Sequence, residues 1–275
     1  MELNEVQEAV TSLSIGSHVI LVRHARSQAN QNNINIVEQG GTKDDFIKVA
    51  TDPKLRDCSI CEYGVKEWEN AKQIASELNI TTVFLSPQRR AFETAYHIFG
   101  DGGDIKFIIV PKMKEGLKAV SDILSNIDNL IDEYKLLFNN LDTSLLDSYN
   151  NRLNCFYEDL QPELRAKLDP KICEKEDDPI NNNIFDLLTE EISQSYPMRT
   201  ESLHNIYQRA RDVEKYIASF KTNEIDEKFV LVGHYTFFMF LTGKWDHFPE
   251  DGIVTTEPNE FFEFNNWQMV NYELK

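Results

Sequence analysis

The chain lacks a long hydrophobic run. Among its 275 residues, no stretch approaches the roughly 18 consecutive apolar residues that a membrane helix needs. Its first ten residues, MELNEVQEAV, also lack the basic segment followed by an apolar segment that marks a secretory signal. We therefore expect a soluble, cytoplasmic protein that does not act at a membrane. Its 41% of hydrophobic residues is enough to form the core of one large domain.

Positive charge is scarce. The 28 lysines and arginines stand against 46 aspartates and glutamates, which gives a net charge of −18. Such a surface repels the phosphates of nucleic acids and of anionic lipids, so we expect neither as a partner. Most of the acidic residues are interpreted as solvated surface. Local clusters of arginine and histidine are informative because they run against this background.

Cysteine is also scarce. The chain has Cys58, Cys61, Cys155 and Cys173, and only the first two have the close spacing typical of metal or redox sites. A zinc site needs four ligands, and no second close pair exists. We expect ordinary reduced thiols, no metal site and no cofactor.

Apolar, β-branched runs that end at turn residues predict buried strands, and apolar residues at helical spacing predict helices between them. The expected strands are His18–Val22, Thr81–Leu85, Lys106–Val110 and Lys228–Val232, and the expected helices are Val65–Leu78, Arg90–Phe99 and Glu201–Phe220. This alternation predicts an α/β three-layer sandwich, with a mostly parallel central sheet flanked by helices. The C-terminal segment EFFEFNNWQMVNYEL predicts a hairpin that turns at Asn265-Asn266.

The alternation stops after the third expected strand. Apolar residues at helical spacing predict one long amphipathic helix from Leu117 to Leu141, and acidic helical sequence continues to Pro197 without a strand. We expect a single domain over residues 1–275, with a core at about 14–117 and 199–275 and a helical insertion at about 118–198. The insertion could cover a pocket or form the surface of a homodimer. The asparagine-rich patches at 30–35 and 181–183 are interpreted as loops or as composition bias.

Two histidines occupy the same setting, at the end of a buried strand and before a helix. They are His24, in Val22-Arg23-His24, and His234, in Val232-Gly233-His234. Ligands of open α/β sheets lie at the carboxyl ends of strands, where helix N-termini offer free N–H groups. The pattern predicts an anion site at this edge of the sheet.

Two further segments bring charged residues to strand ends. Ser86-Pro-Gln-Arg-Arg90 places Arg90 where a guanidinium could bind a phosphate with two nitrogens. Met113-Lys-Glu115 places a carboxyl group just beyond the third strand, where it is a candidate general acid.

Taken together, these segments resemble the histidine phosphatase superfamily, in its phosphoglycerate-mutase-like branch. Residues 23–30, RHARSQAN, are similar to its signature Arg-His-Gly-x-x-x-x-Asn. Residues 86–95 resemble its second-arginine segment, residues 113–115 its acid loop, and residues 233–234 its second histidine. The match covers about two thirds of the chain and excludes residues 118–198. It departs from the pattern at Ala25, which replaces a glycine, and at Arg26, where an acidic residue is common.

The resemblance implies a metal-independent phosphomonoester hydrolase that works through a phosphohistidine on His24. Glu115 would be the acid and base, and Arg23, Arg90 and His234 would bind the phosphoryl group. The residues expected to contact phosphate or substrate are Arg23, Arg26, Ser27, Asn30, Arg90 and His234. The substrate would be a small phosphorylated molecule, with a phosphorylated protein as an open alternative.

Two alternatives stay open. One is a mutase-type phosphotransferase. The mutases carry Glu-Arg-x-Tyr-Gly around the acid, whereas this chain reads Glu115-Gly116-Leu117-Lys118-Ala119, which favours a phosphatase. The other is a catalytically weak scaffold that only binds phosphorylated ligands.

Overall fold

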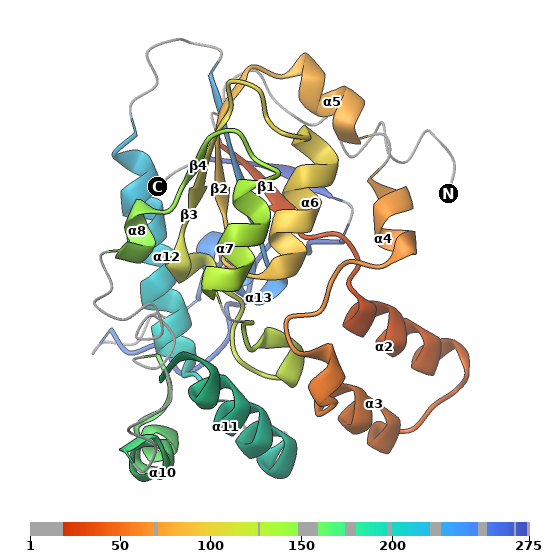
Figure 1. The fold of residues 1–275 in the computed structure, drawn as a ribbon, viewed down its shortest axis with the longest axis vertical. Helices are drawn as coiled ribbons and strands as arrows, with labels where there is room; N and C mark the ends of the chain where they lie inside the picture. Colours follow the sequence, from red (N-terminus) through yellow and green to blue (C-terminus); the bar gives the residue numbers. More distant parts are fainter. Residues whose placement is uncertain are drawn as a thin grey trace.

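The fold is built on a six-stranded sheet (Figure 1). The computed structural model describes residues 19–68, 71–125, 127–147, 159–173, 180–196, 200–220, 227–246, 252–266 and 268–273. The strands are β1 (Val19–Arg23), β2 (Ile80–Leu85), β3 (Lys106–Ile109), β4 (Leu141–Asp142), β5 (Lys228–Gly233) and β6 (Met269–Tyr272). Their order is β4-β3-β2-β5-β1-β6. All neighbours are parallel except β6, which pairs antiparallel with β1. The mostly parallel sheet is confirmed.

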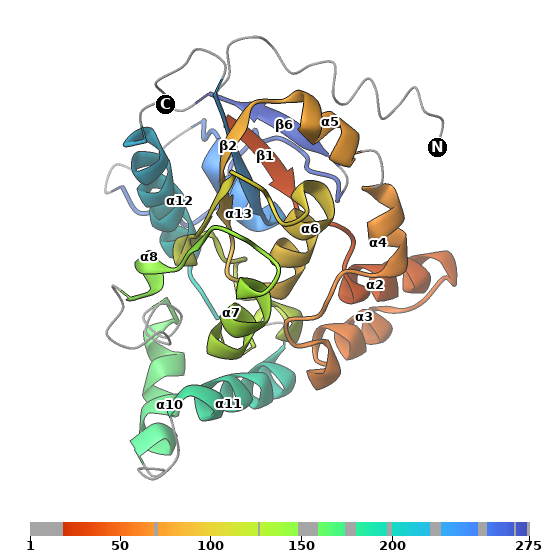
Figure 2. The same ribbon diagram turned by 45° about the horizontal axis from the view of Figure 1, so that its top comes forward.

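Helices cover both faces of the sheet, as the alternating side chains of its strands require. On one face, α5 (Ala71–Glu77), α6 (Arg89–Phe99) and α7 (Ile127–Lys135) share an apolar core with β-strand residues such as Val22 and Val83. On the other face, α12 (Leu203–Ala218) and α13 (Tyr235–Thr242) pack with residues such as Leu21 and Phe84. The expected three-layer sandwich is therefore confirmed (Figure 2).

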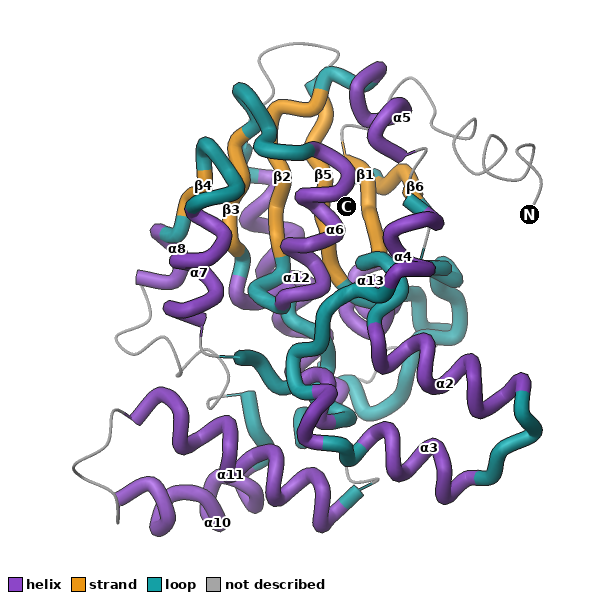
Figure 3. Tube along the Cα trace, turned by 45° about the vertical axis from the view of Figure 1, so that its right-hand side comes forward, coloured by secondary structure: helices purple, strands orange, loops and turns teal. Residues whose placement is uncertain are grey.

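A second group of helices gathers at the carboxyl end of the strands (Figure 3). It contains α2 (Gln28–Glu38), α3 (Lys43–Ala50), α10 (Pro162–Cys173) and α11 (Ile180–Ser195). The remaining described helices are α4 (Glu62–Glu67), α8 (Ser144–Asp147) and the short 3₁₀ helices η1 (Pro53–Leu55), η2 (Pro111–Met113) and η3 (Val120–Asp122). None of the described helices is both long and apolar enough to cross a membrane.

The expected long helix from Leu117 to Leu141 is wrong. The segment forms η3, α7 and the edge strand β4. The side chain of Asp122 accepts hydrogen bonds from the N–H groups of Lys118 and Ala119, so it closes a tight turn where a helix was expected. Beyond α7, the N–H of Phe107 donates to the carbonyl of Asn140, which draws the chain to the edge of the sheet. Apolar side chains at helical spacing here belong to several elements that pack on one core.

Three smaller expectations are also corrected. The helix expected over Val65–Leu78 is two helices, α4 and α5, which meet near Trp68. The asparagine-rich patches lie in α2 and α11 rather than in loops. The C-terminal hairpin does not form, because β6 pairs with β1. β1 gives β6 a buried strand to pair with, whereas a local hairpin would not.

The cysteines contribute no described cross-link. Cys58 is buried and Cys61 is partly exposed, and both are free thiols. Cys155 lies outside the described residues.

Candidate active site

The two predicted histidines meet because their strands are neighbours. In the parallel pair β1 and β5, Arg23 lies opposite Gly233. The next residue after each of these is a histidine, so His24 and His234 lie side by side. The backbone N–H of His24 donates to the carbonyl of Gly233 at 2.9 Å. The two imidazole centroids are 5.1 Å apart, and both side chains are buried.

The hydrogen bonds of His24 define its tautomer. The Nε of Arg90, in the first turn of α6, donates to Nε2 of His24 at 3.2 Å. Arginine carries no acceptor, so Nε2 must present its lone pair. Nδ1 lies 2.7 Å from the carbonyl oxygen of Ala25 and therefore carries the proton. The sequence left the partner of this proton open, and the structure identifies it as the neighbouring backbone.

Both imidazoles are neutral. Burial, and next the positive charges of Arg90 and Arg23, hold the pKa of His24 well below its usual 6.5. Burial and Arg90 likewise hold the pKa of His234 well below that value. A neutral imidazole carries a nitrogen lone pair that can act as a nucleophile, whereas a protonated one does not.

Two nitrogen atoms in this cluster have no hydrogen-bond partner in the described part of the chain. They are Nε of Arg23 and Nδ1 of His234, and both are buried. Nε2 of His234 lies 2.6 Å from the hydroxyl of Ser86, and a nitrogen of Arg23 donates to the carbonyl of Phe264 at 2.6 Å. Buried polar atoms are nearly always hydrogen-bonded, so two free ones beside a nucleophile suit an anionic ligand.

Glu115 enters the cluster from the loop after β3. Its carboxylate accepts hydrogen bonds from the N–H of Gly116 at 2.8 Å and from the N–H of Thr236, at the start of α13, at 3.3 Å. Its charge favours protonation of Arg23, although burial has the larger effect and lowers the pKa of Arg23 overall. The carboxylate is thus held between the strand ends that carry Arg23 and His234.

A buried ionic cluster anchors this acid loop. Arg209 of α12 donates to both carboxylate oxygens of Glu201, at 2.7 and 3.0 Å. It also donates to the carbonyls of Lys112 and Lys114, the residues that lead to Glu115. The ammonium of Lys114 lies 2.8 Å from a carboxylate oxygen of Asp159 and 3.4 Å from one of Glu201. The cluster therefore positions the backbone that carries Glu115.

The structure brings together His24, His234, Arg23, Arg90 and Glu115. The other predicted residues, Arg26, Ser27 and Asn30, bond to neighbouring groups of the chain. Ser27 is the N-cap of α2 and forms a capping box with Asn30. Arg26 forms an ion pair with Glu67. The role of these three residues in substrate binding stays a prediction.

Several residues of the cluster were not predicted from the sequence. The hydroxyl of Thr94 accepts from the N–H of Ala25 at 2.8 Å and donates to the carbonyl of Arg90 at 2.6 Å. Asn266 donates to the carbonyl of His24 at 2.9 Å. The position of Thr94, four residues after Arg90 on one helix, was a usable signal. Nothing in the local sequence connects Asn266 to residue 24.

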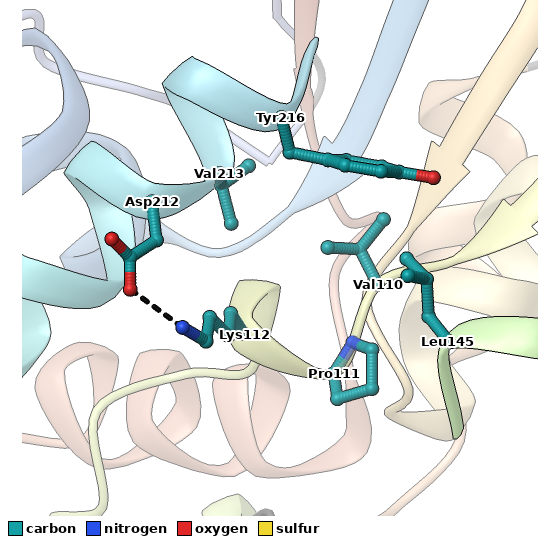
Figure 4. A pocket seen from close by; sticks show the side chains of 7 residues that line it. All are labelled: Val110, Pro111, Lys112, Leu145, Asp212, Val213 and Tyr216. Atoms are coloured by element: carbon teal, nitrogen blue, oxygen red, sulfur yellow. Dashed lines mark hydrogen bonds and ion pairs between the residues drawn. The ribbon is translucent and has the colours of Figure 1, made fainter. Parts of the chain in front are cut away.

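A cavity of about 330 Å³ lies away from this cluster, between α12 on one side and η2 and α8 on the other (Figure 4). Val110, Leu145 and Tyr216 line it, and an ion pair between Lys112 and Asp212 lies at one side. None of the predicted catalytic residues lines it.

No family model and no curated protein sequence matches the chain. Similar solved structures include a glucosyl-3-phosphoglycerate phosphatase of mycobacteria, with 16% identity, a TM-score of 0.39, and coverage of 82% of this chain and 77% of that one. A phosphoserine phosphatase from Entamoeba histolytica has 16% identity and a TM-score of 0.37, over 81% of this chain and 76% of that one. An alpha-ribazole phosphatase from Shigella flexneri has 15% identity and a TM-score of 0.40, over 81% of this chain and 77% of that one.

These three proteins are phosphatases by name. The function proposed for this chain rests on the geometry of its site.

Proposed function

We propose that the chain is a metal-independent phosphomonoester hydrolase that acts through a phosphohistidine on His24. The observation that carries the proposal is the pairing of the two nitrogens of His24. Nδ1–H is held by the carbonyl of Ala25, and Nε2 presents its lone pair toward the guanidinium of Arg90. The Nδ1–H bond fixes the tautomer that leaves a lone pair on Nε2, as a nucleophile requires, and the guanidinium beside it places a cation where the oxygens of a phosphoryl group would lie.

In the first step, Nε2 of His24 attacks phosphorus while the bond to the leaving oxygen breaks. The phosphoryl group takes over the hydrogen bond that Arg90 makes to Nε2. The unpartnered Nε–H of Arg23 supplies a further hydrogen bond to its oxygens, and so does Nδ1 of His234 in the tautomer in which Ser86 donates to Nε2. These bonds lower the barrier by offsetting the charge in the transition state. The carbonyl of Ala25 stabilises the positive charge that develops on the imidazole.

Glu115 acts first as the general acid and then as the general base. In the first step its carboxyl group gives a proton to the leaving oxygen, so the alcohol departs neutral. In the second step the resulting carboxylate takes a proton from water, whose oxygen attacks phosphorus and restores the neutral imidazole. The N–H groups of Gly116 and Thr236 keep the carboxylate in place throughout.

The mutase alternative is disfavoured by the space around Gly116. A Cβ at this position would lie 2.8 Å from the side chain of Ile206 and 3.4 Å from that of Thr236. The side chain that mutases carry after the acid would need the end of the Ile206 side chain to move, whereas Thr236 lies at ordinary contact distance.

One observation favours the scaffold alternative. The guanidinium nitrogens of Arg90 already donate to His24, to the carbonyl of Ser121 and to the carboxylate of Asp122. A site whose arginine already donates to groups of the same chain could bind a phosphomonoester weakly and hydrolyse it slowly. Turnover measurements separate the two functions.

The test measures phosphate release from an aryl phosphate and a panel of phosphomonoesters, with a chelator present. His24→Ala and Glu115→Gln are compared with His97→Ala, which removes an exposed histidine of α6. We expect chelator-resistant release that is lost in His24→Ala, strongly reduced in Glu115→Gln and unchanged in His97→Ala. Release that survives in His24→Ala would refute the phosphohistidine. A wild-type protein that binds phosphate but releases none from any ester would favour the scaffold.

A further inference from the structure

A second buried carboxyl group, that of Asp122, lies in this site. Asp122 ends η3, in the segment that follows the acid loop. One carboxylate oxygen accepts from the N–H groups of Lys118 and Ala119, at 3.2 and 3.0 Å. The other lies 3.2 Å from a terminal nitrogen of Arg90. The carboxylate is therefore aimed at the arginine by its own turn.

The segment that carries Asp122 is tied to the site at several points. The amide of Gln88 donates to the carbonyl of Asp122 at 3.1 Å and accepts from the N–H of Glu115 at 2.8 Å. The carboxylate of Asp57 accepts from the N–H groups of Arg89 and Ser125, both at 3.0 Å. These bonds span the acid loop, η3 and the start of α6. The contact between Asp122 and Arg90 is thus part of a built arrangement rather than a chance approach of two surface side chains.

The charges in the site make this contact consequential. The charged groups that act on Asp122 are Arg90, of α6, and Glu115, of the acid loop. η1 and α11 also pack against η3, and their charged groups beside Ser125 are Arg56, Asp186 and Glu190. The two histidines are neutral. With both carboxyl groups ionised, the positive charges of Arg23 and Arg90 are balanced before any phosphoryl group enters.

We propose that Asp122 determines which charge state of a phosphoryl group this site accepts, because its carboxylate competes with the ligand for the terminal nitrogen of Arg90. The ionised carboxylate disfavours a dianion such as a fully ionised phosphomonoester. A singly charged phosphoryl group, such as the monoanion of a monoester, is accepted more readily. Protonation of Asp122 removes the competition and admits the dianion. This role rests on the proposed function, since it concerns the same site.

The electrostatics agree with this geometry. Burial, and further the charge of Glu115, raise the pKa of Asp122, although Arg90 acts in the opposite direction. The protonated form is therefore populated at a higher pH than for an exposed aspartate. Affinity for a dianion should rise as the pH falls through this raised pKa.

The test uses sulfate, because it stays a dianion throughout the pH range while phosphate itself titrates. Sulfate binding is measured by calorimetry from about pH 5 to about pH 8 in the wild type, in Asp122→Asn and in Asp132→Asn. Asp132 is an exposed residue of α7, so its variant makes the same change of charge outside the site. Asparagine at 122 keeps one oxygen for the turn and removes the negative charge that Arg90 meets. Circular dichroism confirms that each variant is folded.

We expect wild-type affinity for sulfate to rise as the pH falls. Asp122→Asn should bind sulfate about tenfold more tightly than the wild type at the upper end of the range, because the negative charge beside Arg90 is gone, with little dependence on pH. Asp132→Asn should match the wild type. In Glu115→Gln the dependence on pH should persist, because Asp122 still titrates. The role of Asp122 is overturned if Asp122→Asn binds sulfate no more tightly than the wild type, or not at all.

Turnover of an aryl phosphate on the same samples separates this inference from the proposed function. Wild-type turnover together with unchanged sulfate affinity in Asp122→Asn refutes only the role of Asp122. Tighter sulfate binding in Asp122→Asn without turnover in any sample refutes the hydrolase and keeps Asp122 as the residue that controls anion binding.

Discussion

Replacement of Arg209 tests how the acid loop is held. In the folded protein this buried guanidinium binds both oxygens of Glu201, which is itself 1% exposed, and the carbonyls of Lys112 and Lys114. In Arg209→Ala the carboxylate of Glu201 loses its main partner but remains buried. Breaking a buried ion pair on one side costs about 3–5 kcal/mol, and the two carbonyls add to this. We expect the free energy of unfolding to fall by about 4 kcal/mol, a large part of the roughly 5–15 kcal/mol of an ordinary domain.

Urea unfolding at neutral pH, followed by circular dichroism, measures this change. Arg56→Ala is the matched control, because Arg56 forms its ion pair with Asp186 at the surface, where such a pair contributes at most about 1 kcal/mol. Arg209→Lys should recover only part of the loss, because an ammonium cannot bind both oxygens and both carbonyls at once. A loss in Arg209→Ala no larger than in Arg56→Ala would refute the assignment of Arg209 as the anchor of this loop.

Three further predictions concern the nucleophile and its surroundings. Thr94→Val should lower the free energy of unfolding by about 1–2 kcal/mol, because a buried N–H loses its acceptor, and an unchanged urea midpoint would contradict this. Asn266→Ala removes the bond to the carbonyl of His24 and should lower kcat for aryl phosphate with KM little changed, whereas an unaltered kcat would show that the contact does not position the nucleophile. Because the pKa values of His24 and His234 are lowered in the folded state, these two residues take up protons below about pH 6.5 only in the unfolded chain. Their contribution to the free energy of unfolding should therefore decrease as the pH falls, with a slope that approaches about 1.4 kcal/mol per pH unit for each histidine, and His24→Gln should lose one share of this slope in urea unfolding.

The core strands could be predicted from the sequence because each is a short apolar run with a clear end. The runs that became β1, β2, β3 and β5 are buried on both faces along most of their length, so most of their residues are apolar for the same reason. The charged residues at their ends then had to lie at one edge of the sheet. This is why the positions of His24, Arg90 and His234 along the chain were enough to place them together.

The wrong helix prediction arose where apolar side chains of several different elements pack on one core. From Leu117 to Leu141 the apolar residues follow helical spacing, but the turn closed by Asp122 and the edge strand β4 interrupt the helix. Helical spacing records which residues face a core and not whether the backbone between them is continuous. For the same reason Asp122 was not predicted as part of the site. Its contact with Arg90 depends on a turn that no local sequence pattern indicated.

Contacts from distant segments were also beyond sequence reasoning. Asn266 reaches the carbonyl of His24 across 242 positions, and Arg23 reaches Phe264 across 241. Both contacts follow from the pairing of β6 with β1, which replaced the expected hairpin. A prediction based on neighbouring residues favours the local turn, whereas the folded chain gains more from the free edge of a buried strand.

The proposed hydrolysis requires that His24 carries the phosphoryl group during turnover. The most direct measurement mixes the protein with an aryl phosphate labelled at phosphorus, quenches the reaction in base, where phosphohistidine survives, and locates the label by peptide mass spectrometry. We predict label on His24 in the wild type, more of it in Glu115→Gln, which lacks the base for hydrolysis, and none in His24→Ala. Turnover without label on His24, or label on another residue in the wild type, would contradict the account.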